Sequence, residues 1–373
     1  MSFLKFAPKV AILCCSAILS VSALSARTVT DDNGDRVDVP EKIERVVVAN
    51  ILPLAAALTA YTGDGSIVAG MHPASYSAAK NGLLGELFPE VLRADTSFIR
   101  GAALNVEALM ALEPDLVLIN APDRRMLEQV RSAGLAAYAV SPTKWHYDVV
   151  ETYRGWTASL EQLFPEVDGK GALIEARTRE IESLVADRTK DIAEKDRARV
   201  LFIVRLDEKE IVTSGRNFFG EYWCRAAGAA NAAHDLEAEN ANARLSMESV
   251  YGYDPDVVIL TNFTKAVPSD LREGKIPGQD WTPLKAVEEN RIYKMPLGLY
   301  RTFTPGADTP LTLLWLAKTL YPARFEDVDL ARETKRWYKE IVGVDLTDAQ
   351  VERMYSPDRA AAEGASQGVR STQ

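Results

Sequence analysis

Cysteine and histidine, which often carry cross-links and metal sites, are scarce in this sequence. The 373 residues include three of each. Cys14 and Cys15 lie within the first 26 residues, so a chain that has lost this segment retains Cys224 alone and cannot form an intrachain disulfide. We expect Cys224, in an apolar stretch, to be a buried structural thiol. The few, irregularly spaced histidines argue against a bare Zn²⁺ or Mn²⁺ site, which needs several converging His and carboxylate ligands.

Signatures of several enzyme classes are also missing. No phosphate-binding loop ending in Gly-Lys-Ser or Gly-Lys-Thr occurs. The glycines of Gly63-Asp64-Gly65 lack the third glycine of a dinucleotide fingerprint, so this segment is interpreted as a turn. The net charge is −10, which becomes −12 without the two lysines of the first 26 residues (−10 − 2). An acidic surface disfavours nucleic acid, and together these features favour a binding protein over an enzyme.

The first 26 residues predict a secretory signal peptide. Lys5 and Lys9 are followed by an apolar run, Val10–Ala23, and by small residues up to Ala26. The run is shorter than the roughly 20 residues that span a bilayer, which disfavours the alternative of an uncleaved anchor. Both early cysteines lie inside the run, so we expect no lipid attachment. The sequence predicts cleavage after Ala23 or Ala26 and export to the periplasm.

A segment of the chain recurs 141 residues later without a gap. Residues 104–119 and 245–260 share a leucine, a glutamate, a Pro-Asp pair and a valine in register. Each copy begins with a helix N-cap residue, Asn105 or Ser246, and ends in a continuous apolar run typical of a buried parallel strand. The repeat predicts two lobes of similar construction.

The remaining pattern predicts an α/β fold of two Rossmann-like lobes with parallel sheets, joined by one long backbone helix, with the ligand cleft between the lobes. Strands and helices alternate in both halves, which favours parallel pairing with right-handed crossovers. Between the halves, apolar residues recur at helical spacing from about Gly169 to Lys195, a rod roughly 40 Å long. The predicted divisions are a signal peptide 1–26, a first lobe 27–167, a connecting helix 168–196, a second lobe with terminal helices 197–355, and a disordered tail 356–373.

These stretches together resemble the helix-hinged solute-binding proteins of ABC importers for ferric siderophores, haem and cobalamin. The resemblance covers nearly the whole chain after the signal peptide. Each matching stretch is weak alone, and the resemblance depends on all of them occurring in the same order. The matching stretches include Thr30–Pro40, Arg45–Val48, Leu104–Glu107, Pro114–Val117, Ala133–Leu135, Ala227–Asn231, Pro255–Val258, Asn290–Tyr293, Trp315–Ala317 and Tyr321-Pro322. It implies a periplasmic component, working as a monomer outside the membrane, that delivers a small ligand to a permease.

Ligands of α/β lobes lie beyond the carboxyl ends of the strands. This rule nominates Asn50, Trp145, His146, Arg205, Tyr300 and Arg301, and Arg100 precedes Leu104 where the family often places a ligand contact. Arginines and aromatic rings suit an anionic ligand, and a ferric siderophore-like chelate is the expected ligand, with no covalently bound cofactor. His72 and His146 are candidates to complete the coordination of a metal held by such a chelator.

The identity of the ligand stays open at this point. Cobalamin, haem, a nickel chelate and molybdate are alternatives on the same scaffold, and an exported sensor that serves another receptor is an alternative to transport. The resemblance also implies that a glutamate on top of each lobe binds arginines of the permease. Glu107 and its repeat partner Glu248 occupy those positions. Favourable charges at a helix start would explain either residue alone, but not their recurrence.

Overall fold

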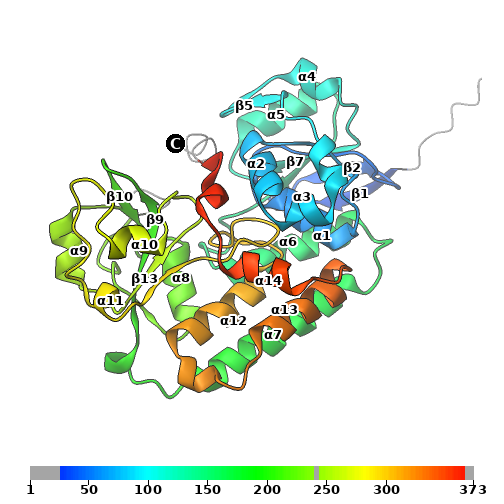
Figure 1. The fold of residues 1–373 in the computed structure, drawn as a ribbon. Helices are drawn as coiled ribbons and strands as arrows, with labels where there is room; N and C mark the ends of the chain where they lie inside the picture. Colours follow the sequence, from blue (N-terminus) through cyan, green and yellow to red (C-terminus); the bar gives the residue numbers. More distant parts are fainter. Residues whose placement is uncertain (1–25, 239–242, 366–373) are drawn as a thin grey trace, which may run out of the picture.

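A computed structural model describes residues 26–238 and 243–365 (Figure 1). The predicted signal peptide lies outside these ranges except for Ala26, which begins strand β1 (Ala26–Thr30). Strand β1 forms an antiparallel hairpin with β2 (Arg36–Pro40). None of the helices in the described ranges combines the length and the apolar character that a bilayer crossing needs.

The first lobe is built on a four-stranded parallel sheet. Its strand order is β4 (Val68–Met71), β3 (Val46–Val48), β7 (Leu116–Asn120) and β8 (Ala137–Val140). Both faces are covered, because alternate residues of β3 and β7 enter two different hydrophobic clusters. The helices and short strands of this lobe are α1 (Leu54–Thr62), α2 (Pro73–Asn81), α3 (Leu83–Leu87), β5 (Ile99–Arg100), β6 (Ala103–Leu104), α4 (Val106–Met110), α5 (Arg124–Ser132) and α6 (Val149–Leu163).

The second lobe contains a six-stranded sheet that is mixed rather than parallel. Its order is β12 (Ala243–Leu245), β10 (Ile211–Thr213), β9 (Arg199–Leu206), β13 (Val257–Leu260) and β14 (Ile292–Lys294), with β11 (Ala230–Asn231) beside the start of β9. The prediction of a parallel sheet is therefore correct for β9, β13 and β14 and wrong for β10 and β12. The cause is the short connection between β9 and β10, which permits only an antiparallel hairpin. Its helices are α8 (Phe219–Ala226), α9 (Met247–Tyr253), α10 (Pro268–Arg272) and α11 (Lys285–Glu288).

The internal repeat has the same structure in both lobes. Helix α4 precedes β7, and α9 precedes β13. The Asn105 side chain accepts a hydrogen bond from the amide of Ala108, and Ser246 accepts one from Ser249, so each helix begins at the capping residue that the sequence predicts.

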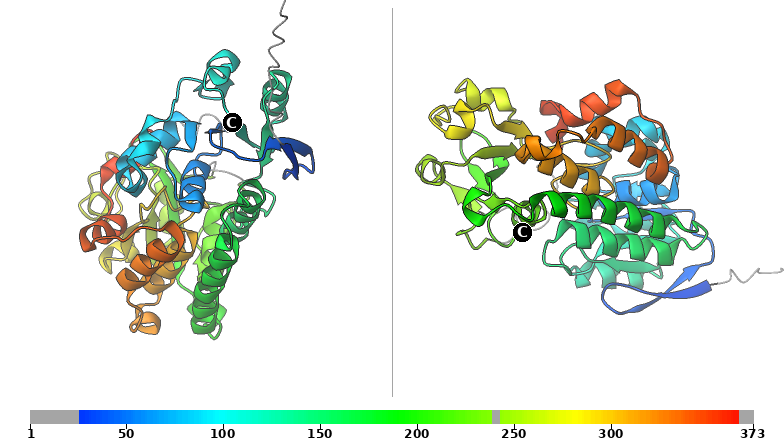
Figure 2. Two further views of the ribbon diagram at one scale, coloured as in Figure 1. Left: turned by 90° about the vertical axis from the view of Figure 1, so that its right-hand side faces the viewer. Right: turned by 90° about the horizontal axis from the view of Figure 1, so that it is seen from below.

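One helix connects the lobes, but it is shorter than expected. Helix α7 spans Lys170–Thr189, about 30 Å at 1.5 Å per residue. The chain then leaves the helix, and Glu194–Asp196 forms a separate 3-10 turn. Along the base of the molecule α7 lies beside α12 (Thr309–Leu320) and α13 (Leu330–Trp337), as Figures 1 and 2 show.

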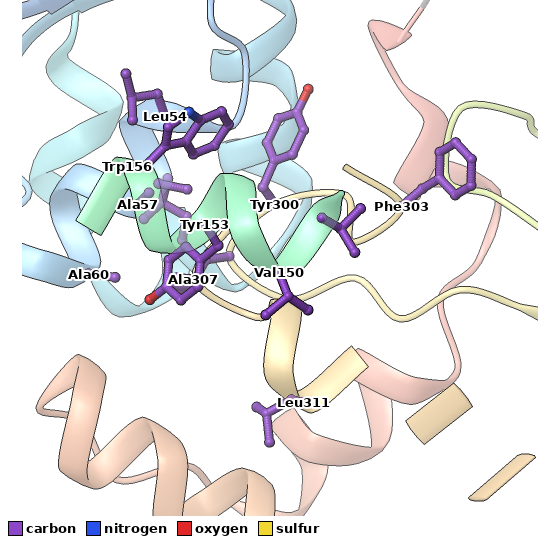
Figure 3. Packing of buried hydrophobic residues seen from close by; sticks show 14 of the residues in the cluster. Leu54, Ala57, Ala60, Val150, Tyr153, Trp156, Tyr300, Phe303, Ala307 and Leu311 are labelled. Carbon is purple, nitrogen blue, oxygen red and sulfur yellow. The ribbon is translucent and has the colours of Figure 1, made fainter. Parts of the chain in front are cut away.

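The two lobes share a hydrophobic core beneath the sheets. Figure 3 shows side chains of α1, α6, the loop after β14 and α12 in one contiguous cluster, including Leu54, Trp156, Tyr300, Phe303 and Leu311. Such a core resists separation, because pulling the lobes apart would expose apolar surface from both sides.

The C-terminal residues do not form the disordered tail that composition predicted, at least as far as residue 365. Helix α14 (Asp348–Tyr355) is followed by a 3-10 turn, Arg359–Ala362, and Ala361, Ala362 and Ala365 are buried. Small alanine side chains let this segment pack closely, although its composition resembles a linker. Residues 366–373 lie outside the described ranges.

Candidate ligand site between the lobes

The carboxyl ends of strands from both lobes point to a common junction. In the first lobe, β4 continues through His72 into the first turn of α2. In the second lobe, the residues after β13 lead to Phe263, and the loop after β14 carries Arg301. The lobes touch here, because Arg301 Nη1 donates to the carbonyl oxygen of Ala74 at 3.4 Å.

Arg301 is the most distinctive residue of this junction. Its exposed fraction is 1%, yet no carboxylate in the described ranges forms an ion pair with it. Besides Ala74, its partners are the carbonyl oxygens of Ala361, 3.0 Å from Nε, and Glu363, 2.5 Å from Nη2, and the hydroxyl oxygen of Tyr300, 3.5 Å from Nη1. Burying a cation without a counter-charge is costly. The site is therefore prepared for an anion, which a guanidinium binds more strongly than it binds neutral carbonyls.

Two aromatic rings flank the guanidinium. Arg301 Cζ lies 5.6 Å from the ring centroids of both Phe263 and Tyr300. Tyr300 is itself buried, and burial raises the pKa of its hydroxyl. The rings keep water away from the cation, which strengthens its attraction for an anion.

His72 supports the junction as a structural group. It is buried, and its Nδ1 accepts a hydrogen bond from the amide of Ala74 at 3.1 Å, so it caps α2. Burial lowers the pKa of His72, against a smaller opposing effect of the Gly101 backbone. Within the described ranges no three His, Cys, Asp or Glu side chains converge to hold a metal ion. By capping α2, His72 fixes the turn whose Ala74 carbonyl meets Arg301.

The other predicted contacts have different surroundings. Asn50 bridges the sheet edge, donating to Asp123 at 3.0 Å and accepting from the Asn120 amide at 2.8 Å. Arg100 is exposed on β5. The prediction that Arg205 follows its strand is wrong, because Arg205 lies inside β9. Its Nε is 3.1 Å from Glu210 Oε1.

The loop before α6 carries the remaining predicted residues. Trp145 packs against Gly155 so closely that a Cβ there would lie 1.9 Å from the indole ring. His146 is exposed and has a positive φ of 50°. Tyr147 faces the second lobe, with its ring 5.3 Å from those of Phe218 and Phe219. This loop therefore contributes to the contact between the lobes.

Several features of the junction escaped the sequence analysis. Phe263 lies three residues beyond β13, so the strand-end rule that selected Arg301 would also have found it. The carbonyls of Ala361 and Glu363 carried no signal, because any residue has a carbonyl.

The sequence also contains the Gly-x-Ser-x-Gly spacing of a nucleophile elbow, in Gly364-Ala365-Ser366-Gln367-Gly368. A nucleophile elbow follows a strand, whereas Gly364 follows a 3-10 turn, and Ser366 lies outside the described ranges.

Outside the junction, Cys224 is buried, and the two glutamates of the repeat are exposed, as the sequence predicts. Cys224 is a buried free thiol, as expected, and burial raises its pKa. Glu107 and Glu248 are exposed in the first turns of α4 and α9. Three residues after each glutamate lies a large exposed apolar side chain, Met110 or Tyr251. The two copies of the repeat thus present the same pairing of acid and apolar group.

Comparisons with known proteins agree with this architecture. Residues 70–297 match the model of a family described as periplasmic binding protein. The molybdate-binding protein MolA of Haemophilus influenzae is 26% identical, over 94% of this chain and 98% of its own. An Fe(3+)-citrate-binding protein of Bacillus subtilis is 26% identical over 51% of this chain and 56% of its own. The crystal structure of a periplasmic solute binding protein from Veillonella parvula superposes with a TM-score of 0.80 at 24% identity, covering 91% of this chain and all of that one.

Proposed function

Because this chain belongs to the periplasmic binding protein family, we propose that it captures a small anionic ligand between its two lobes and delivers it to the permease of an ABC importer. The observation that carries the proposal is the buried guanidinium of Arg301, which meets no carboxylate in the described ranges. A ligand with anionic oxygens would supply the missing charge.

Two kinds of ligand provide such oxygens. A ferric chelate offers carboxylate, hydroxamate or catecholate oxygens around the metal, and Phe263 and Tyr300 would pack against its organic part. An oxyanion such as molybdate offers the oxygens alone, and the molybdate-binding relative matches nearly the full chain. In both cases any metal arrives inside the ligand, which suits a site without converging metal-binding side chains among the described residues.

A titration of the full chain tests this function. Molybdate and ferric citrate are titrated separately into ligand-free protein by calorimetry, with native, Arg301→Ala, Arg301→Lys and Arg205→Ala chains. We expect Arg301→Ala to weaken binding of the true ligand by at least about tenfold, or 1.4 kcal/mol. Arg301→Lys should also weaken it, because an ammonium lacks the planar fork of donors.

Arg205→Ala is the matched control, because its guanidinium already pairs with Glu210. It should bind within about twofold of the native chain, because a guanidinium whose charge Glu210 already neutralises has less attraction left for an anion. Native-like affinity in Arg301→Ala for a ligand that the native chain binds would contradict the proposed role of Arg301.

A further inference from the structure

The last described residues cross from one lobe to the other. After α14 the chain rises into the space between the lobes, where Figure 1 shows it in red. We call residues 356–365 the C-terminal strap. On the first lobe, the hydroxyl of Ser77 in α2 donates to the carbonyl of Glu363 at 2.7 Å. On the second lobe, both terminal nitrogens of Arg359 donate to the carboxylate of Asp270 in α10, each at 2.6 Å.

The strap also covers the cation of the proposed ligand site. The carbonyls of Ala361 and Glu363 hold Nε and Nη2 of Arg301, two donors on which anionic oxygens would bind. These two donors of Arg301 are thus occupied while the strap is in place.

The strap's contacts with Arg301 are weaker in kind than its anchor on the second lobe. Arg359 is 54% exposed, but it forms a bidentate pair with Asp270, whose side chain is 4% exposed, and such pairs are the stronger kind. The strap's carbonyls are neutral, whereas an anion binds a buried guanidinium with full charge. An anionic ligand would therefore form stronger contacts with Arg301 than the strap does.

We propose that the C-terminal strap is an internal competitor for the ligand: it occupies Arg301 in the ligand-free protein and is displaced when an anion binds. This inference rests on the proposed role of Arg301. It predicts that the observed affinity is reduced by the fraction of molecules in which the strap is closed.

Stopped-flow association of molybdate and of ferric citrate, followed by tryptophan fluorescence, tests the competitor. The full chain is compared with a chain that ends at Tyr355 and with Arg359→Ala. If the strap is closed in nine molecules of ten, its removal should speed association about tenfold, with a smaller gain for Arg359→Ala. Arg353→Ala is the matched control, since Arg353 pairs with Glu86 just before the strap and should leave the rate unchanged.

The outcomes separate the two proposals. Equal binding by the native and Arg301→Ala chains would overturn the proposed function. If Arg301→Ala abolishes binding but the shortened chain associates no faster than the full chain, the strap does not compete with the ligand, and the proposed function stands. Hydrogen exchange on the full chain gives a second measurement should the shortened chain fail to fold. Amides 359–365 should exchange faster when the ligand is bound. Unchanged protection of these amides would contradict the displacement of the strap by the ligand.

Discussion

At the scale of single residues, burial controls which charges this molecule can carry. Arg301 and Asp308 are both buried, and among residues 26–238 and 243–365 Arg301 pairs with no acid and Asp308 with no cation. Sequence position selected Arg301, because it follows a strand. The same rule also selected Arg205, which the β9 hairpin binds to Glu210. Position along the chain shows which end of a sheet a residue is near, but it does not show which neighbour neutralises its charge.

Asp308 yields a prediction about stability and pH. Its carboxylate accepts hydrogen bonds from the Tyr338 hydroxyl at 2.7 Å and the Leu299 amide at 2.8 Å, yet burial dominates and raises its pKa from 3.8 to about 6. The folded state therefore binds this proton more tightly than the unfolded state. The stability that Asp308 contributes is fully present below pH 4 and is lost as the pH rises through 6.

The Asp308→Asn variant removes this titration. Relative to the variant, we expect the native chain to lose about 2–3 kcal/mol of unfolding free energy between pH 4 and pH 7. Urea unfolding of both chains at intervals across that range measures the difference. A difference that stays constant with pH would show that Asp308 does not titrate there.

At the scale of elements, a buried arginine links the connecting helix to the C-terminal helices. Arg177 of α7 contacts Glu340 at 3.0 Å and Glu333 at 3.5 Å, and it also pairs with Glu180. Two of these acids belong to the segment that follows α12. The connecting helix is thereby attached to the C-terminal helices as well as to the lobes.

Arg177→Met should therefore destabilise the protein. We expect a loss of about 2–4 kcal/mol, because three carboxylates would lose their buried cation and keep the more exposed Arg336 as the one they share. Arg179→Met is the matched control, since Arg179 is 73% exposed and pairs with Glu175 within the helix; it should cost less than about 1 kcal/mol. Chemical unfolding measures both, and equal effects would mean that the Arg177 cluster does not hold the helix.

Periodicity and capping residues predicted the existence of these elements better than their ends. The apolar spacing identified α7, but the helix stops at Thr189, where the chain turns toward β9. Asn105 and Ser246 marked two helix starts correctly, because a capping side chain acts within three residues. The antiparallel β10 was missed although only a short connection separates it from β9, and the strap was missed because its partners lie far along the chain.

At the scale of the whole molecule, the repeat gives both lobes the same outward-facing feature. Glu107 with Met110 and Glu248 with Tyr251 occupy equivalent positions on α4 and α9. Two acids held at a separation fixed by the shared core would register the protein on a permease with two matching cationic sites.

The double variant Glu107→Ala, Glu248→Ala tests this docking. Uptake of the ligand by cells should be abolished, while the ligand affinity of the purified protein stays native, because neither glutamate lies at the Arg301 junction. The double variant Glu128→Ala, Glu289→Ala removes two other exposed acids and should transport normally. Native uptake in the Glu107, Glu248 variant would remove the docking role.

A crystal structure of the complex with the ligand identified by titration would show where that ligand binds. We expect anionic oxygens of the ligand to lie on the guanidinium of Arg301 between the lobes, with the carbonyls of Ala361 and Glu363 withdrawn from it. A ligand bound elsewhere, with Arg301 still holding both carbonyls, would contradict this expectation.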